Sequence, residues 1–159
     1  MVPQQALYFE DIEIGAAPPE IKKGPLTTVH LMRWSAAMEN WHKIHYDKPF
    51  AIDHDKLPDL LVSGSLKQQF IIQLLKDWVG VTGWVWKVSF QFRAMNNVGE
   101  TLSAWGRVTG KRPAPGYGLV ELDVGITNDQ GAESTPGRAT VAVPHRGGAA
   151  VPYPFVAPV

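Results

Sequence analysis

Apolar residues recur with helical spacing in the first half of the chain. After Thr27 or Thr28, either of which can cap a helix, a short amphipathic pattern begins. Its apolar positions are Leu31, Trp34, Ala37 and Met38. Residues 41–50 interrupt this spacing, and Pro49 marks a turn or a new start. The pattern predicts one short helix followed by an irregular polar segment.

A second, longer helical pattern follows Gly64 or Ser65 and is stopped by Gly80. It runs from about Ser65 to about Val79. Its apolar positions cover a wide arc: Leu66, Phe70, Ile71, Leu74, Leu75 and Trp78. The pattern predicts a helix that is buried over most of its surface.

From Trp84 onward the apolar positions alternate with a period of two, as expected for strands. Four alternating segments are bounded by Gly, Pro or Asn: residues 85–94, 101–112, 118–128 and 137–144. The first alternating residues are assigned mostly to the core of the sheet: Trp84, Trp86, Val88, Phe90 and Phe92. Several long strands after one strongly apolar helix predict an α+β fold, with an antiparallel sheet wrapped around a central helix.

The connections between these strands carry turn signals. Residues 96–100 and 128–132 resemble hairpin connections, and residues 113–118 resemble a longer turn. We assign residues 1–145 to a single domain, because 159 residues suffice for one core and not for a second. The Gly/Pro-rich residues 146–159 form a C-terminal tail, either loose or lying as a strap over a neighbour. Tyr153 and Phe155 favour the strap.

Charge and composition exclude several classes of protein. Fifteen basic and fifteen acidic residues give a net charge of +0, which argues against a nucleic-acid partner. The absence of cysteine removes disulfides, thiolate nucleophiles and zinc–thiolate sites. The first 15 residues carry acids where a signal peptide needs a basic stretch, and no apolar run approaches the ~20 residues of a membrane span. We expect a soluble, cytoplasmic protein without a membrane partner.

Side chains that can carry chemistry are concentrated between the two predicted helices. They are Asn40, His42, His45, Tyr46 and Asp47, and they lie near Trp34, Trp41 and Phe50 in the sequence. Titratable groups beside apolar walls suit proton transfer. A lone histidine here would more often cap a helix or solvate a loop, but two histidines with an amide and a carboxylate favour a functional site.

The same segment could be considered for metal binding. His42, His45 and Asp47 are nitrogen and oxygen ligands, and His54 follows further along. Their spacing matches no closed structural site, and it lacks the helical i, i+4 histidine pair that presents two imidazoles to one metal. We therefore expect no metal.

A glycine at the start of the long helix is the second candidate feature. In the sequence VSGSL, the Gly64 N–H lies at the positive end of the helix dipole, where it can polarise a carbonyl oxygen. An ordinary N-terminal cap, with Ser63 or Ser65 as the capping residue, explains the same pattern, and the two interpretations are compatible.

Several stretches resemble the MaoC-like hydratases and dehydratases, from about Tyr8 to about Val143. They read FEDIEIG at 9–15, RWSAAMENWHKIHYDKPFA at 33–51 and FRAMNNVGETL at 92–102, with the glycine before the long apolar helix between them. The resemblance implies a hot-dog fold and activity on enoyl and hydroxyacyl thioesters of coenzyme A or acyl carrier protein. It implies no cofactor beyond that carrier, which is part of the substrate.

The family motif usually reads Gly-Asp-x-Asn-Pro-x-His-x-Asp. Its histidine falls on His45 and its last aspartate on Asp47, whereas Asn40 replaces the catalytic aspartate and Glu39 the glycine. This variant resembles the branch containing mitochondrial-type hydroxyacyl-thioester dehydratases and mesaconyl-CoA hydratase relatives. In that branch a histidine often precedes the helix glycine, and here Ser63 does.

The resemblance implies a role for each site residue. His45 exchanges protons with water and the α-carbon, and the Gly64 N–H faces the thioester carbonyl. Asn40 only positions the water, because a carboxamide cannot take up a proton at neutral pH. Substrate-binding positions are His42, Ser63, Tyr46 and Asp47. Of these, Tyr46 and Asp47 orient the loop, and His42 orients substrate or is itself the base. Scattered basic residues are candidates for coenzyme A phosphates, although such residues are more often solvated surface: Lys22, Lys23, Arg93, Arg107, Lys111 and Arg112.

Two alternatives to hydration remain open. The chain could be a non-catalytic or partner-dependent acyl-CoA-binding subunit of a heteromeric hydratase, because it lacks the usual aspartate. It could also be a hot-dog thioesterase, which needs a nearby carboxylate: Glu39, Asp47, Asp53, Asp55 or Asp59. In each case the exposed edge of a hot-dog sheet implies a homodimer or larger assembly, or a hetero-oligomer.

Overall fold

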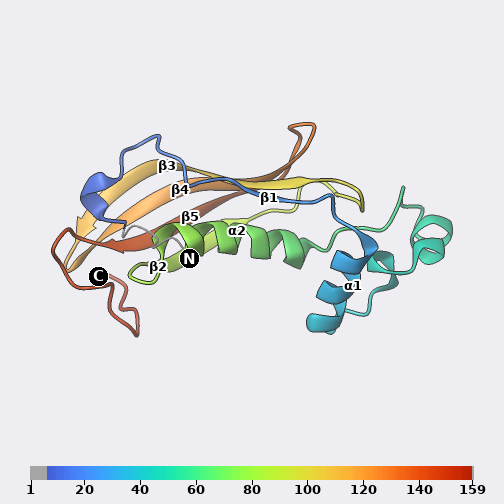
Figure 1. The fold of residues 1–159 in the computed structure, drawn as a ribbon, viewed down its shortest axis with the longest axis horizontal. Helices are drawn as coiled ribbons and strands as arrows, with labels where there is room; N and C mark the ends of the chain where they lie inside the picture. The colour runs from blue at the N-terminus through green and yellow to red at the C-terminus, as the bar shows by residue number, and fades with distance from the viewer. Residues whose placement is uncertain (1–6, 159) are drawn as a thin grey trace.

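Five antiparallel strands form one curled sheet in the order β1-β3-β4-β5-β2 (Figure 1). The computed structural model describes residues 7–158. The strands are β1 (Ile21–Lys23), β2 (Trp84–Phe90), β3 (Leu102–Ala114), β4 (Tyr117–Asn128) and β5 (Glu133–Pro144). The predicted α+β class is confirmed.

The central helix, α2 (Gly64–Val79), lies against the sheet and fills its inner face. The predicted apolar positions are buried, apart from Trp78, which is half-buried. They pack on alternate residues of the long strands, such as Val120, Leu122 and Val124. Lys67 on the same helix is also buried, which the apolar pattern did not predict.

The assignment of the first alternating residues to the core holds for Val88 and Phe90, which are partly buried against it, but it is wrong for Trp84 and Phe92. Trp84 and Phe92 are exposed, and Trp86 is half-buried against the C-terminal segment. A bulge shifts the register between Val85 and Lys87, so that Val85 and Val88 both face the core. Strict alternation fails at a bulge because the extra residue reverses the faces.

The connections also differ in part from prediction. Residues 128–132 form the expected hairpin between β4 and β5, but residues 96–100 join β2 to β3, which are not neighbours in the sheet. Only two residues, Pro115 and Gly116, separate β3 from β4, so this turn is shorter than expected. The three-residue edge strand β1 was missed, because it is too short to show a period.

Residues 28–62 form a lobe beyond one end of the sheet, beside the N-terminal end of α2 (Figure 1). The lobe contains α1 (Thr28–Ala37), η2 (Lys43–His45) and η3 (Phe50–His54). On α1 the buried side chains are Leu31 and Ser35, whereas Ala37 and Met38 are exposed, contrary to the predicted stripe.

At the opposite end, the C-terminal segment lies over this chain's own sheet. Phe155 stacks on Trp84 with ring centroids 6.2 Å apart, and the Tyr117 hydroxyl donates to the Val156 carbonyl. Near it, η1 (Phe9–Asp11) is held by Lys111, whose ammonium donates to the carbonyls of Phe9 and Ile12. Lys111 therefore holds η1 against the sheet.

Within residues 7–158, no helix is long and apolar enough to cross a bilayer.

Candidate active site

The C-terminus of α1 places Asn40. The Asn40 N–H donates to the Ser35 carbonyl and the Glu39 N–H to the Ala36 carbonyl, which is the Schellman pattern of a helix end. That pattern requires a left-handed residue, and Glu39 has φ of 49°. Glycine adopts this conformation without strain, and the family motif has glycine at this position. The Asn40 Oδ1 accepts from the His42 N–H at 3.3 Å.

The His45 imidazole is buried and held by one strong hydrogen bond. Its Nδ1 lies 2.8 Å from the Leu61 carbonyl oxygen, and the Leu61 N–H donates to the Ile44 carbonyl. Because a carbonyl only accepts, Nδ1 carries the proton of this bond. In the neutral ring Nε2 is then the basic atom. Leu61 is three residues before Gly64, so the same short segment orients the imidazole and leads into α2.

The N-terminus of α2 has no side-chain cap. Ser63 occupies the N-cap position, but its hydroxyl makes no cap hydrogen bond. It lies 2.9 Å from the Ser65 hydroxyl, which accepts from the Trp34 indole N–H. Ser63 is thus the N-cap residue, as one interpretation expected, but neither serine caps the helix with its side chain, because these hydroxyls bond to each other and to α1. Within residues 7–158, the Gly64 N–H has no hydrogen-bond acceptor.

Close packing against Phe92 also favours glycine at position 64. A Cβ at this position would lie 2.8 Å from the ring of Phe92, which is half exposed. A larger residue here therefore requires Phe92 to move.

The remaining predicted residues lie close to His45 in the sequence, in the same loop. The His42 ring lies 6.2 Å from the His45 ring, and its Nδ1 accepts from the Ile44 N–H. The Tyr46 hydroxyl donates to the Trp41 carbonyl at 2.7 Å, and the Asp47 carboxylate accepts from the Phe50 N–H. In this structure Tyr46 and Asp47 thus make contacts within the loop.

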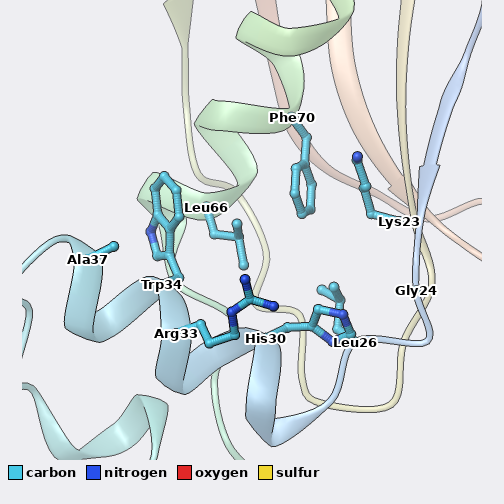
Figure 2. Close-up of a pocket in the computed structure, with 9 residues that line it drawn as sticks. All are labelled: Lys23, Gly24, Leu26, His30, Arg33, Trp34, Ala37, Leu66 and Phe70. Carbon is cyan, nitrogen blue, oxygen red and sulfur yellow. The ribbon is translucent and has the colours of Figure 1, made fainter.

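A cleft of about 460 Å³ lies between α1, α2 and β1 (Figure 2). Its apolar walls include Trp34, Leu66 and Phe70, and its rim carries three basic side chains, Lys23, His30 and Arg33. The Lys23 ammonium lies 6.0 Å from the centre of the Phe70 ring. The cleft begins at Leu66, two residues beyond Gly64, and His45 does not line it. Sequence reasoning missed this cleft, because its walls come from three separate elements.

Lys67 is a second residue that the sequence did not single out. Its ammonium donates to the Ala94 carbonyl at 2.9 Å and to the Asn96 Oδ1 at 3.1 Å. Burial lowers the pKa of Lys67 to about 8, and the nearby Glu100 carboxylate partly opposes this shift. The sequence did contain a signal for this residue, because Lys67 lies between the apolar positions Leu66 and Phe70 of the long helix.

Among the described residues, no three His, Cys, Asp or Glu side chains converge as a metal site would require.

Comparison with known proteins identifies the family. The family model for hydroxyacyl-thioester dehydratase type 2 matches residues 11–100, more than half of the chain. The chain belongs to this family. No curated protein sequence is significantly similar to the chain.

Solved structures share the fold at low identity. An (R)-hydratase from A. caviae involved in PHA biosynthesis has a TM-score of 0.76 and 23% identity, over 85% of this chain and 99% of its own. The R-hydratase PhaJ1 from Pseudomonas aeruginosa has a TM-score of 0.78 and 17% identity, over 88% of this chain and 87% of its own. A chain of the ChsH1–ChsH2 complex from Mycobacterium tuberculosis has a TM-score of 0.72 and 17% identity, over 82% of this chain and 98% of its own. The hot-dog fold and the MaoC-like resemblance are thereby confirmed, and the family is one of acyl-thioester hydratases and dehydratases.

Proposed function

We propose that the protein reversibly hydrates a 2-enoyl thioester to a 3-hydroxyacyl thioester, with His45 as the acid and base. The observation that carries the proposal is the 2.8 Å hydrogen bond from His45 Nδ1 to the Leu61 carbonyl. It fixes Nε2 as the basic atom of the neutral ring, and it ties the ring to the segment that ends at the uncapped Gly64 N–H. A base and an unused N–H donor at one helix end are the two groups that this reaction needs.

The reaction follows from these groups. His45 Nε2 takes a proton from water as its oxygen bonds to C3 of the enoyl group, and the electron pair of the double bond moves toward the thioester carbonyl. The Gly64 N–H donates to this developing enolate oxygen. The imidazolium then returns the proton to C2, so that one water is added in total. Asn40 positions the water through its carboxamide, which can donate and accept but cannot carry the proton.

We assign the acyl chain to the cleft between α1 and α2. The cleft has apolar walls and begins within one helical turn of Gly64. Ser63 and Ser65 connect its Trp34 wall to the start of α2. No cofactor is needed beyond the carrier to which the acyl group is attached.

The test is loss of the conjugated-thioester absorbance of 2-butenoyl-CoA. We expect His45→Ala to lower kcat roughly 10²–10⁴-fold, the usual contribution of a general acid–base group. His54→Ala is the matched control, because the His54 side chain is 70% exposed and contacts Phe50 and Asp55, neither of which has a role in the proposed reaction. Equal rates for wild type and His45→Ala would overturn the assignment of His45.

A partner-dependent subunit is the second candidate, favoured by Asn40 in place of the family aspartate. One of the similar structures is a complex of two different proteins. This alternative predicts that the purified chain binds the saturated butanoyl-CoA, seen as a rise in Tm, yet turns over 2-butenoyl-CoA only after a partner chain is added.

A thioesterase is less well supported, because three of the five candidate carboxylates have other partners. Asp59 pairs with Lys48 at 2.8 Å, Asp55 contacts His54, and Asp47 accepts from the Phe50 N–H. Release of free thiol from butanoyl-CoA would be the sign of this activity.

A further inference from the structure

Lys67 is a buried cation that no carboxylate of residues 7–158 contacts directly. Its side chain, on the first turns of α2, leaves the residue 2% exposed. Its ammonium donates to the Ala94 carbonyl, the Asn96 Oδ1 and, at 3.5 Å, the Ser134 hydroxyl. These three acceptors match in number the three N–H groups of an ammonium ion.

Two of the residues near the Lys67 ammonium, Asn96 and Phe92, also contact the segment that leads into α2. The Asn96 carbonyl accepts from the Val62 N–H at 2.8 Å, and Val62 is two residues before Gly64. The Lys67 ammonium also lies 5.4 Å from the centre of the Phe92 ring, the ring that packs on Gly64. Lys67 therefore connects residues 92–96 to the segment that carries both the Leu61 carbonyl and the Gly64 N–H.

We propose that Lys67 is a positioning residue for the reaction above, on which this inference rests. Its ammonium holds residues 92–96 against the first turn of α2, and this fixes the Gly64 N–H and the Leu61 carbonyl that orients His45. Lys67 also follows Gly64 by three residues, so its positive charge belongs to the same end of α2 at which an enolate oxygen would develop negative charge. Burial raises the strength of such a charge because little solvent screens it.

The surroundings of Lys67 make its charge sensitive to alkaline pH. Burial lowers its pKa to about 8. Glu100 is the charged group that faces it, through Asn96, whose amide donates to the Glu100 carboxylate at 2.8 Å. The α2 residues one turn away are Ser63, Gly64, Phe70 and Ile71, and all are uncharged, as are Phe92, Ala94 and Ser134.

The experiment compares Lys67→Gln and Lys67→Met with wild type across pH 6–10. We expect the wild-type kcat to fall above pH about 8 as the ammonium loses its proton. Both variants should lack this alkaline fall and show kcat lowered about tenfold or more at pH 7, with a smaller change in KM. Lys76→Gln is the control, because Lys76 is exposed near the other end of α2. Circular dichroism verifies that each variant folds.

A second measurement does not depend on turnover. The amide NMR signals of Val62 and Gly64 should shift with a midpoint near pH 8 in wild type and in Lys76→Gln, but not in Lys67→Gln. If neither signal titrates in wild type, or if the Lys67 variants keep the wild-type pH profile of kcat, the positioning role is wrong. If instead His45→Ala is as active as wild type, it is the proposed function that fails.

Discussion

The two ends of the central helix are built for different purposes. At the C-terminal end of α2, Gly80 closes the helix and its N–H donates to the Lys76 carbonyl. At the N-terminal end the first N–H has no cap, a lysine is buried, and a histidine is held by a neighbouring carbonyl. The N-terminal end, where the Gly64 N–H remains free within residues 7–158, is therefore the end at which we propose the reaction takes place. Mutations at the N-terminal end should change rates, and those at the C-terminal end should change stability.

Among changes that compare the two ends of α2, the largest effect on kcat is expected from Gly64→Pro. Proline is favoured at the first position of a helix, so this change removes the N–H while keeping the helix. We expect kcat with 2-butenoyl-CoA to fall roughly 10²–10³-fold further than in Gly64→Ala, as for loss of one oxyanion donor. Gly64→Ala is the matched control, because it also crowds Phe92 but retains the N–H. Equal rates for the two variants would show that the N–H has no role.

Lys67 should affect stability and activity in opposite directions as the pH rises. Its pKa is about 8 in the folded chain and 10.5 ordinarily, so the folded state binds fewer protons between these values. The unfolding free energy of wild type minus that of Lys67→Met should therefore increase between about pH 8 and 10.5, by roughly 2–3 kcal/mol. Urea unfolding at both pH values measures this difference. A difference that stays constant or falls would contradict the buried, charged state of Lys67.

At the other helix end, Gly80→Ala should cost stability and leave the rate unchanged. Gly80 has φ of 63° and ψ of −160°, a region open essentially to glycine alone. We expect a loss of about 1–3 kcal/mol in the unfolding free energy. Thermal unfolding measures the loss of stability, and kcat of the folded variant measures the rate. A lowered kcat would contradict the expectation that the C-terminal end of α2 affects stability alone.

A smaller, stabilising change in the unfolding free energy is expected from a substitution at the C-terminal end of α1. Glu39 has φ of 49°, so Glu39→Gly relieves a left-handed strain and should raise the unfolding free energy by about 1 kcal/mol. Glu39→Ala is the control, because alanine keeps the strain while losing the carboxylate. If the alanine variant is stabilised as much as the glycine variant, charge rather than backbone conformation is responsible.

The sequence predicted the parts of the molecule that have a regular period. The burial of Leu74 and Leu75 on α2 followed from spacing alone, and so did the long strands. The bulge at Trp86 and the strand β1 could not be predicted, because one extra residue or a three-residue strand leaves no periodic signal.

The candidate site was predictable by residue type but not by contact. The family motif drew attention to Asn40 and His45, which lie at a helix end and in a short helix. The Leu61 carbonyl that orients His45 is a backbone atom, which no side-chain pattern reveals. The acceptors of Lys67 lie 27 and 29 residues away in the sequence, so its role depends on the folded chain.

The most direct test is the structure of the protein with bound butanoyl-CoA, a saturated thioester that cannot be hydrated. The account predicts that the thioester oxygen lies about 2.7–3.1 Å from the Gly64 nitrogen, with C3 of the acyl group facing His45 Nε2. A thioester bound away from Gly64, with His45 Nε2 turned toward another part of the chain, would contradict the proposed active site.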